Sequence, residues 1–128
     1  MHQYNKLIVW EKSINVACSI YQLTKFFPAD EKFGLISQMT RAAVSISSNI
    51  AEGSGRNSKK EFVQFLSIAN GSACELETQL LISHKLKYCS EEVYREISKE
   101  LFSIKNMLFS LIKKQQQPPK TKVLIPNT

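Results

Sequence analysis

The segment of the sequence best suited to bind an anion lies between positions 53 and 60. Residues 53–56 read Gly-Ser-Gly-Arg, and residues 58–60 read Ser-Lys-Lys at the predicted start of a helix. Glycines free backbone amides, a helix N-terminus carries partial positive charge, and basic side chains surround this one. We therefore expect a phosphate-binding loop that uses Arg56, Lys59 and Lys60. The alternative is that the glycines end one helix and Ser58 caps the next.

Other chemistry finds little support in the sequence. Serines cluster between positions 45 and 48, but no histidine lies within helical reach, because the histidines are His2 and His84. A Ser-His-acid arrangement is therefore not indicated. The cysteines are odd in number and widely spaced, which argues against a zinc site or a disulfide framework. The glutamates match neither the carboxylate pair of glycosidases nor the Glu-x-x-His motif of di-iron bundles. We predict no catalytic residue, no metal, no cofactor and no enzymatic activity.

Positive charge is concentrated near the C-terminus. The chain of 128 residues has a net charge of +6, and no acidic residue follows position 112. Residues 1–112 hold 13 basic and 11 acidic side chains, so the body is nearly neutral. Four lysines supply the remaining charge: Lys113, Lys114, Lys120 and Lys122. Clustered lysines without acids are typical of phosphate-binding surfaces, so we add Lys113 and Lys114 to the candidate anion-binding residues.

Four amphipathic helices are needed to position these side chains. Apolar residues recur at spacings of three and four over residues 6–27, 33–53, 58–87 and 91–115. Ser58 and Ser90 precede the last two segments and are predicted N-caps. Short connections predict an all-α, antiparallel, up-and-down four-helix bundle over residues 1–114. A basic, proline-containing tail, extended or disordered, is expected at residues 115–128. A short apolar run at residues 123–125 could dock on the bundle or stay loose.

The second predicted helix carries little charge on any side. On a helical wheel its outward stripe holds small polar residues, with one arginine and one glutamate. A helix with so little charge is usually buried all round, which its own chain cannot achieve in a bundle of this size. We therefore expect another copy of the chain to cover it. The outward residues are Arg41, Ser45, Ser48 and Glu52, and Asn49 lies between this stripe and the core face.

The third predicted helix gives a matching indication. Its outward side includes Gly71 and two isoleucines, which suggests contact with protein. An antiparallel hairpin places Arg41 about one helical turn from Glu75, close enough for an ion pair within the chain or between copies. We expect this pair to be covered, because buried charges are retained only when paired. The alternative is that both are ordinary, half-exposed surface charges.

Several short motifs carry a family resemblance. They are Trp10-Glu11-Lys12, Phe27-Pro28, Arg41-Ala42-Ala43-Val44-Ser45-Ile46, Asn49-Ile50-Ala51-Glu52-Gly53, Gly55-Arg56 and Gly71-Ser72 followed by Glu75. Over residues 4–112 the sequence resembles the four-helix-bundle proteins encoded in intervening sequences of bacterial 23S ribosomal RNA genes. The resemblance implies a bacterial, cytoplasmic homopentamer that forms a ring, with no enzymatic activity. The accessory protein of diversity-generating retroelements, which binds nucleic acid and a reverse transcriptase, is similar in fold.

Two functions follow as expectations. The first is an oligomeric, non-enzymatic protein that binds structured RNA, DNA or a nucleoprotein partner through phosphate contacts. The second is a scaffold that binds only protein, with lysines that serve solubility. The aromatic residues fall mainly on predicted core faces, so we do not expect sequence-specific base stacking. The free cysteines and the lack of a long apolar run favour a cytoplasmic protein without a membrane span.

Overall fold

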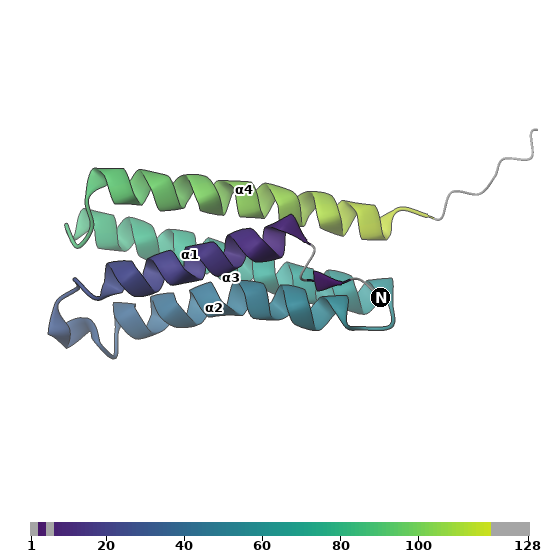
Figure 1. Cartoon of the computed structure of the whole chain (residues 1–128), viewed down its shortest axis with the longest axis horizontal. Coiled ribbons are helices and arrows are strands. Elements are labelled where there is room, and N and C mark those ends of the chain that lie inside the picture. Colours follow the sequence, from purple (N-terminus) through teal and green to yellow (C-terminus); the bar gives the residue numbers. More distant parts are fainter. Residues whose placement is uncertain (1–2, 5–6, 119–128) are drawn as a thin grey trace, which may run out of the picture.

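The four predicted helices are present in a computed structural model of the chain, which describes residues 3–4 and 7–118. They are α1 (Ile8–Thr24), α2 (Leu35–Ser54), α3 (Lys59–Lys85) and α4 (Glu91–Gln116), with a short 3-10 helix, η2 (Ala29–Glu31), between the first two. Consecutive helices lie side by side and alternate in direction (Figure 1). The described part of the chain contains no strand, so the all-α prediction is confirmed.

The helix ends follow from local chemistry. The hydroxyl oxygens of Ser58 and Ser90 accept hydrogen bonds from the amides of Glu61 and Val93, at 3.1 and 3.2 Å, which confirms both predicted N-caps. At its other end α4 continues through Gln116, two residues past the predicted domain boundary at 114. Gln115 is buried there, so it belongs to the bundle. Residues 119–128, which include Lys120, Lys122 and the apolar run, lie outside the described residues.

The connection between α3 and α4 is a Schellman motif. The amides of Lys87 and Tyr88 donate to the carbonyl oxygens of His84 and Ser83, at 2.9 and 2.8 Å. These are the two hydrogen bonds that define the motif. Lys87 adopts a φ of 65°, in the left-handed region that favours glycine. A tight reversal is therefore achieved here with a residue that is strained in this conformation.

The core lies along the centre of the bundle and is almost wholly aliphatic. Of the residues that the structure describes, twenty apolar ones are buried, among them Ile20, Met39, Leu66 and Leu101, each fully enclosed. The approach of α2 to α3 depends on Gly53, because a Cβ there would lie 2.6 Å from the Cβ of Phe65. The apolar rows predicted for α2, α3 and α4 are buried or half-buried, and the hairpin of α2 and α3 is packed closely at its turn. In α1 the same spacing also placed Ile14 and Tyr21 on the core face, but both are exposed. No helix in the described residues is long and apolar enough to cross a membrane.

Candidate association surface and basic end

The hairpin of α2 and α3 is nearly free of charge. Within α2 the only charged residues are Arg41 and Glu52, and between Phe62 and Ser83 of α3 the only ones are Glu75 and Glu77. Each of the four forms an ion pair within the chain. By contrast, α4 carries nine charged residues over a similar length. The hairpin therefore presents a surface with almost no unpaired charge, which is unusual for a helix face in water.

Arg41 and Glu75 meet as the sequence suggested. The Nη2 atom of Arg41 lies 2.6 Å from Oε1 of Glu75, within one chain. The arginine side chain is 66% exposed and the glutamate 44%, so the expectation of a covered pair is not met in the single chain. At this exposure an ion pair contributes about 0–1 kcal/mol to stability. Its contribution can rise only if something outside the chain excludes water from it.

Next to this ion pair along α2, one hydroxyl pair joins α2 to α3, and an asparagine amide bonds within α2. The hydroxyls of Ser45 and Ser72 are 2.8 Å apart. The amide nitrogen of Asn49 donates to the carbonyl oxygen and the hydroxyl of Ser45, at 2.8 and 2.9 Å. Ser48 is exposed beside them. Ser45, Ser72 and Asn49 thus have hydrogen-bond partners within the chain, which lowers the cost of covering them with another protein.

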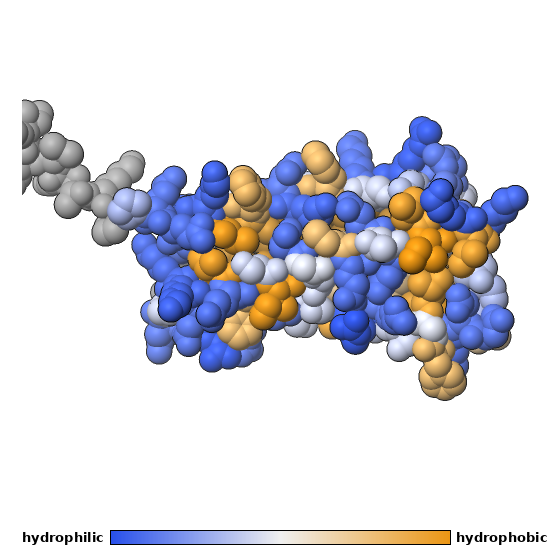
Figure 2. All heavy atoms as spheres, turned by 180° about the vertical axis from the view of Figure 1, so that it is seen from behind, coloured by the Kyte–Doolittle hydropathy of each residue, from blue (hydrophilic) through white to orange (hydrophobic). Residues whose placement is uncertain are grey.

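No contact within the chain explains why a glycine occupies position 71. A Cβ at Gly71 would meet nothing within 4 Å, and the residue is exposed in the middle of α3. Glycine in a helix interior costs about 1 kcal/mol relative to alanine. Two exposed isoleucines, Ile68 at 51% and Ile82 at 43%, lie on the same side of the helix. Seen from behind, where α3 is nearest the viewer, hydrophobic areas flank near-neutral ones (Figure 2).

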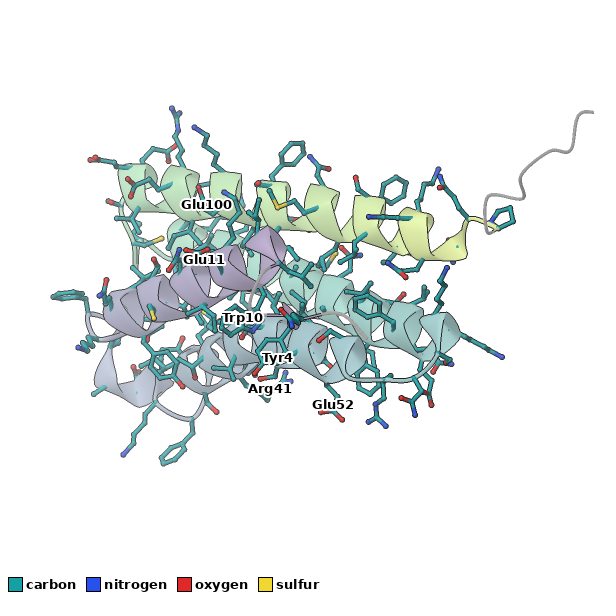
Figure 3. All side chains as sticks on the ribbon, turned by 45° about the vertical axis from the view of Figure 1, so that its right-hand side comes forward. Tyr4, Trp10, Glu11, Arg41, Glu52 and Glu100 are labelled. Carbon is teal, nitrogen blue, oxygen red and sulfur yellow. The ribbon has the colours of Figure 1, made fainter. Side chains whose placement is uncertain are left out.

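We call this surface the association face. Figure 3 shows Arg41 and Glu52, two of its members, on the same outward side of α2. The association face consists of Arg41, Ser45, Ser48, Asn49 and Glu52 on α2 with Ile68, Gly71, Glu75 and Ile82 on α3.

Basic side chains gather at the end of the bundle where α3 begins and α4 ends. Lys59 and Lys60 line a hollow of about 370 Å³ together with Gln115 and Gln116. Lys113 and Lys114 lie in the last turn of α4, the helix that also carries Gln115 and Gln116. The fold therefore brings two lysine pairs, more than 50 positions apart in the sequence, to the same end of the bundle. We call Arg56, Lys59, Lys60, Lys113 and Lys114 the basic end.

The predicted phosphate loop is not formed as expected. The backbone amides of Gly55 and Arg56 donate to the carbonyl oxygens of Glu52 and Gly53, at 3.3 and 3.1 Å, and so are not free to bind an anion. The guanidinium of Arg56 lies 2.5 Å from a carboxylate oxygen of Glu52 and 4.9 Å from the centre of the Phe65 ring. The glycines and Ser58 thus serve the helix ends, which was the alternative interpretation.

Three features were not anticipated from the sequence. Phe102 and Phe109 are more than 60% exposed, although the aromatic residues were expected mainly on core faces. An apolar groove lies between α1 and α4, where helix periodicity predicts only a closed core. The Nε2 atom of His84 lies 2.7 Å from a carboxylate oxygen of Glu91, and its ring stacks on Tyr94, so that these contacts join the ends of α3 and α4. All three features depend on how the helices pack against one another, which the spacing of apolar residues does not specify.

The cysteines differ in surroundings. Cys18 and Cys74 are exposed, whereas Cys89 is half-buried. Burial, and then the negative charge of Glu91, raise the pKa of the Cys89 thiol, which disfavours the reactive thiolate. Among the described residues, no group of three or more histidine, cysteine or acidic side chains is placed to hold a metal ion.

Comparisons with known proteins agree with the fold. The profile of the 23S rRNA-intervening sequence protein family matches residues 5–110. The chain is similar to a crystal structure of a protein of unknown function, from the S23 ribosomal protein family of Bacteroides thetaiotaomicron. That pair is 32% identical with a TM-score of 0.77, over 83% of this chain and 99% of the other. No curated protein matches the chain in sequence. The chain belongs to the 23S rRNA-intervening sequence protein family.

Proposed function

We propose that the protein is a non-enzymatic bundle that associates with copies of itself through the association face. The observation that carries this proposal is the near absence of unpaired charge on that face, together with exposed isoleucines. A surface of this kind gains free energy when it is removed from water, because apolar area is buried without the cost of stripping water from isolated charges.

Gly71 supports the same proposal. Its lack of a side chain costs helix stability and gives no benefit inside the chain, so a close neighbour outside the chain would account for it. The resemblance to pentameric relatives makes a ring of five copies the assembly that we expect. Light scattering over a range of micromolar concentrations tests this directly. A mass of one chain throughout would refute self-association, and a stable mass other than five chains would refute the pentamer alone.

Nucleic-acid binding at the basic end is our second proposal. Lys59 and Lys60 lie in the first turn of α3, where the helix dipole disfavours positive charge. A phosphate bound between them and the C-terminal turn of α4 would relieve this repulsion. A ring would repeat the site in every subunit, and the repeated weak contacts would add up to useful affinity. The bound partner would be RNA, DNA or a nucleoprotein, held by phosphate contacts.

A titration of labelled RNA and DNA at several salt concentrations tests this second proposal. Phosphate contacts release counterions, so affinity must fall steeply as salt rises. Binding that does not depend on salt, or no binding at low salt, would favour the alternative of a scaffold that binds only protein. The ion pair between Arg56 and Glu52 favours this alternative, because Glu52 neutralises the charge of one of the expected phosphate-binding residues.

A further inference from the structure

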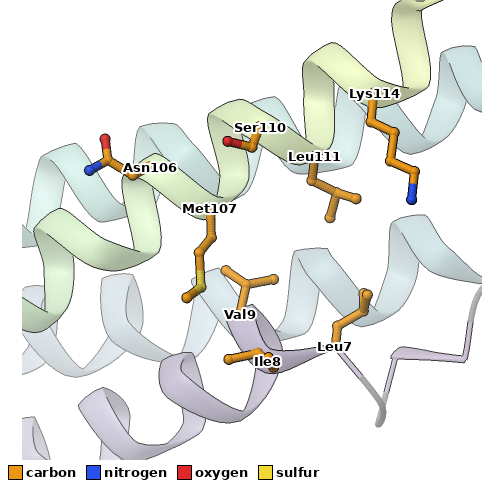
Figure 4. Close-up of a pocket in the computed structure, with 8 residues that line it drawn as sticks. All are labelled: Leu7, Ile8, Val9, Asn106, Met107, Ser110, Leu111 and Lys114. Carbon is orange, nitrogen blue, oxygen red and sulfur yellow. The ribbon is translucent and has the colours of Figure 1, made fainter.

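An apolar groove opens beside the basic end, between the first turn of α1 and the last turns of α4 (Figure 4). It has a volume of about 550 Å³. Aliphatic side chains from both helices form most of its lining, and among the described lining residues only Lys114, at one end, is charged. The lining includes Leu7, Ile8, Met107 and Leu111.

The groove is suited to an aliphatic segment. Ile8 is 64% exposed at its edge, so a large apolar side chain has little cover from the described residues. Sites for small polar ligands usually add several convergent polar groups to an apolar lining. Here the polar groups are the side chains of Asn106, Ser110 and Lys114, all on one helix. An apolar segment that buries Ile8 and leaves the ammonium group of Lys114 in water would therefore bind this groove most favourably.

The chain itself contains such a segment. The described chain ends at Pro118, two residues after α4, close to the groove. Residues 119–128 read PKTKVLIPNT, and their one apolar run is Val123-Leu124-Ile125. We propose that residues 123–125 fold back and dock in the groove of their own chain.

The distances allow this docking. Val123 is five positions beyond Pro118, which gives a reach of roughly 17 Å when the chain is extended. Leu111 lies five residues before the end of α4, or about 7.5 Å along the helix axis. Docking within the chain is favoured over docking on a second copy, because a short linker gives an effective concentration in the millimolar range.

The methyl group of Met107 provides a direct probe, because Met107 lines the groove. We would compare methyl NMR spectra of methionine-labelled full-length protein and of protein truncated after Pro118. The proposal predicts a different Met107 resonance in the two proteins. Met39, which is fully buried in the core, should be unchanged and serves as an internal control. Leu124→Asp in the full chain should reproduce the truncated spectrum, whereas Lys120→Ala with Lys122→Ala should not.

A second pair of variants guards against indirect effects. Ile8→Asp places a carboxylate at the groove and at the N-terminus of α1, where the helix tolerates it. In this background, truncation should no longer move the Met107 resonance. Ile14→Asp is the matched control, since Ile14 is an exposed isoleucine of the same helix that does not line the groove. In that background truncation should still move the Met107 resonance.

Two results would overturn the proposal. The first is a Met107 resonance that is the same in full-length and truncated protein. The second is a shift in labelled truncated chains after they are unfolded and refolded with unlabelled full-length chains, because the segment would then dock on a second copy. Neither result bears on self-association through the opposite hairpin or on nucleic-acid binding.

Discussion

Arg41 and Glu75 join α2 to α3 through an ion pair of 2.6 Å that remains largely open to solvent in the single chain. Its neighbours on the association face carry almost no other charge. An exposed pair surrounded by small, uncharged side chains is stable in water and can also be buried without leaving an unpaired charge. The same pair is therefore compatible with both the free and the covered state of the face.

The effect of Arg41→Ala should depend on protein concentration. Arg95→Ala is the matched control, because Arg95 also pairs with a glutamate and is 76% exposed. In dilute protein each substitution should lower the free energy of unfolding by less than about 1 kcal/mol. Where the protein is associated, Arg41→Ala should cost on the order of 3 kcal/mol, because it leaves Glu75 buried and unpaired. Denaturant unfolding at two concentrations measures this, and equal effects throughout would show that Arg41 is never covered.

Gly71→Lys should separate folding from assembly. The isolated chain has open space at Gly71, and lysine is a better helix former by roughly 0.7 kcal/mol, so the fold should be retained. Assembly should weaken, because a charge without a partner would be buried. Circular dichroism and light scattering report the two properties separately. Gln22→Lys adds the same charge to an exposed position of α1 and should leave the mass unchanged. Full assembly of Gly71→Lys would place the interface elsewhere.

The sequence predicted the four helices, both serine caps and the Arg41–Glu75 pair. These depend on local spacing and on the antiparallel register, which short connections largely determine. It did not predict the ion pair between Glu52 and Arg56. Glu52 lies inside α2 and Arg56 lies just beyond its last residue, so their distance depends on the backbone conformation at the end of the helix. Exposed Phe102 and the groove beside Met107 were missed for a related reason. Periodicity identifies an apolar face but not how completely neighbouring helices cover it.

Lys59→Ala combined with Lys60→Ala should reduce the salt dependence of nucleic-acid binding. On duplex DNA the slope of log affinity against log salt should flatten by about 0.9 for each phosphate that the variant no longer neutralises. The helix should not be weakened, since Ser58 still caps it and positive charge leaves its N-terminus. Anisotropy titrations at several salt concentrations measure the slope.

Lys85→Ala combined with Lys87→Ala is the matched control for this pair, because it removes two lysines at the α3–α4 turn, the far end of the bundle. A slope that changes equally in both double variants would show that binding follows total charge and not the basic end. Truncation after Pro118 tests only Lys120 and Lys122, and it keeps the last turn of α4 with Lys113, Lys114 and buried Gln115.

Lys87→Gly should stabilise the bundle. Lys87 adopts a positive φ in the Schellman motif, where a non-glycine residue costs roughly 1 kcal/mol and glycine costs little. The gain is reduced by the greater freedom of glycine in the unfolded chain, so we expect a net rise of several tenths of a kcal/mol. Thermal unfolding measures the change in Tm. A lower Tm would mean that the Lys87 side chain makes a stabilising interaction that outweighs its backbone strain.

The central claim is that a second copy covers the association face, and cysteine labelling tests it most directly. The protein would carry Ile68→Cys with Cys74→Ser and Cys89→Ser, so that exposed Cys18 on α1 remains as the internal reference. Ile68 is 51% exposed in the single chain, so both thiols should react with a maleimide at similar rates in dilute protein. As concentration rises and the measured mass increases, the account predicts that Cys18 keeps its rate while the thiol at position 68 becomes protected. Equal rates at both positions in the fully assembled protein would contradict it.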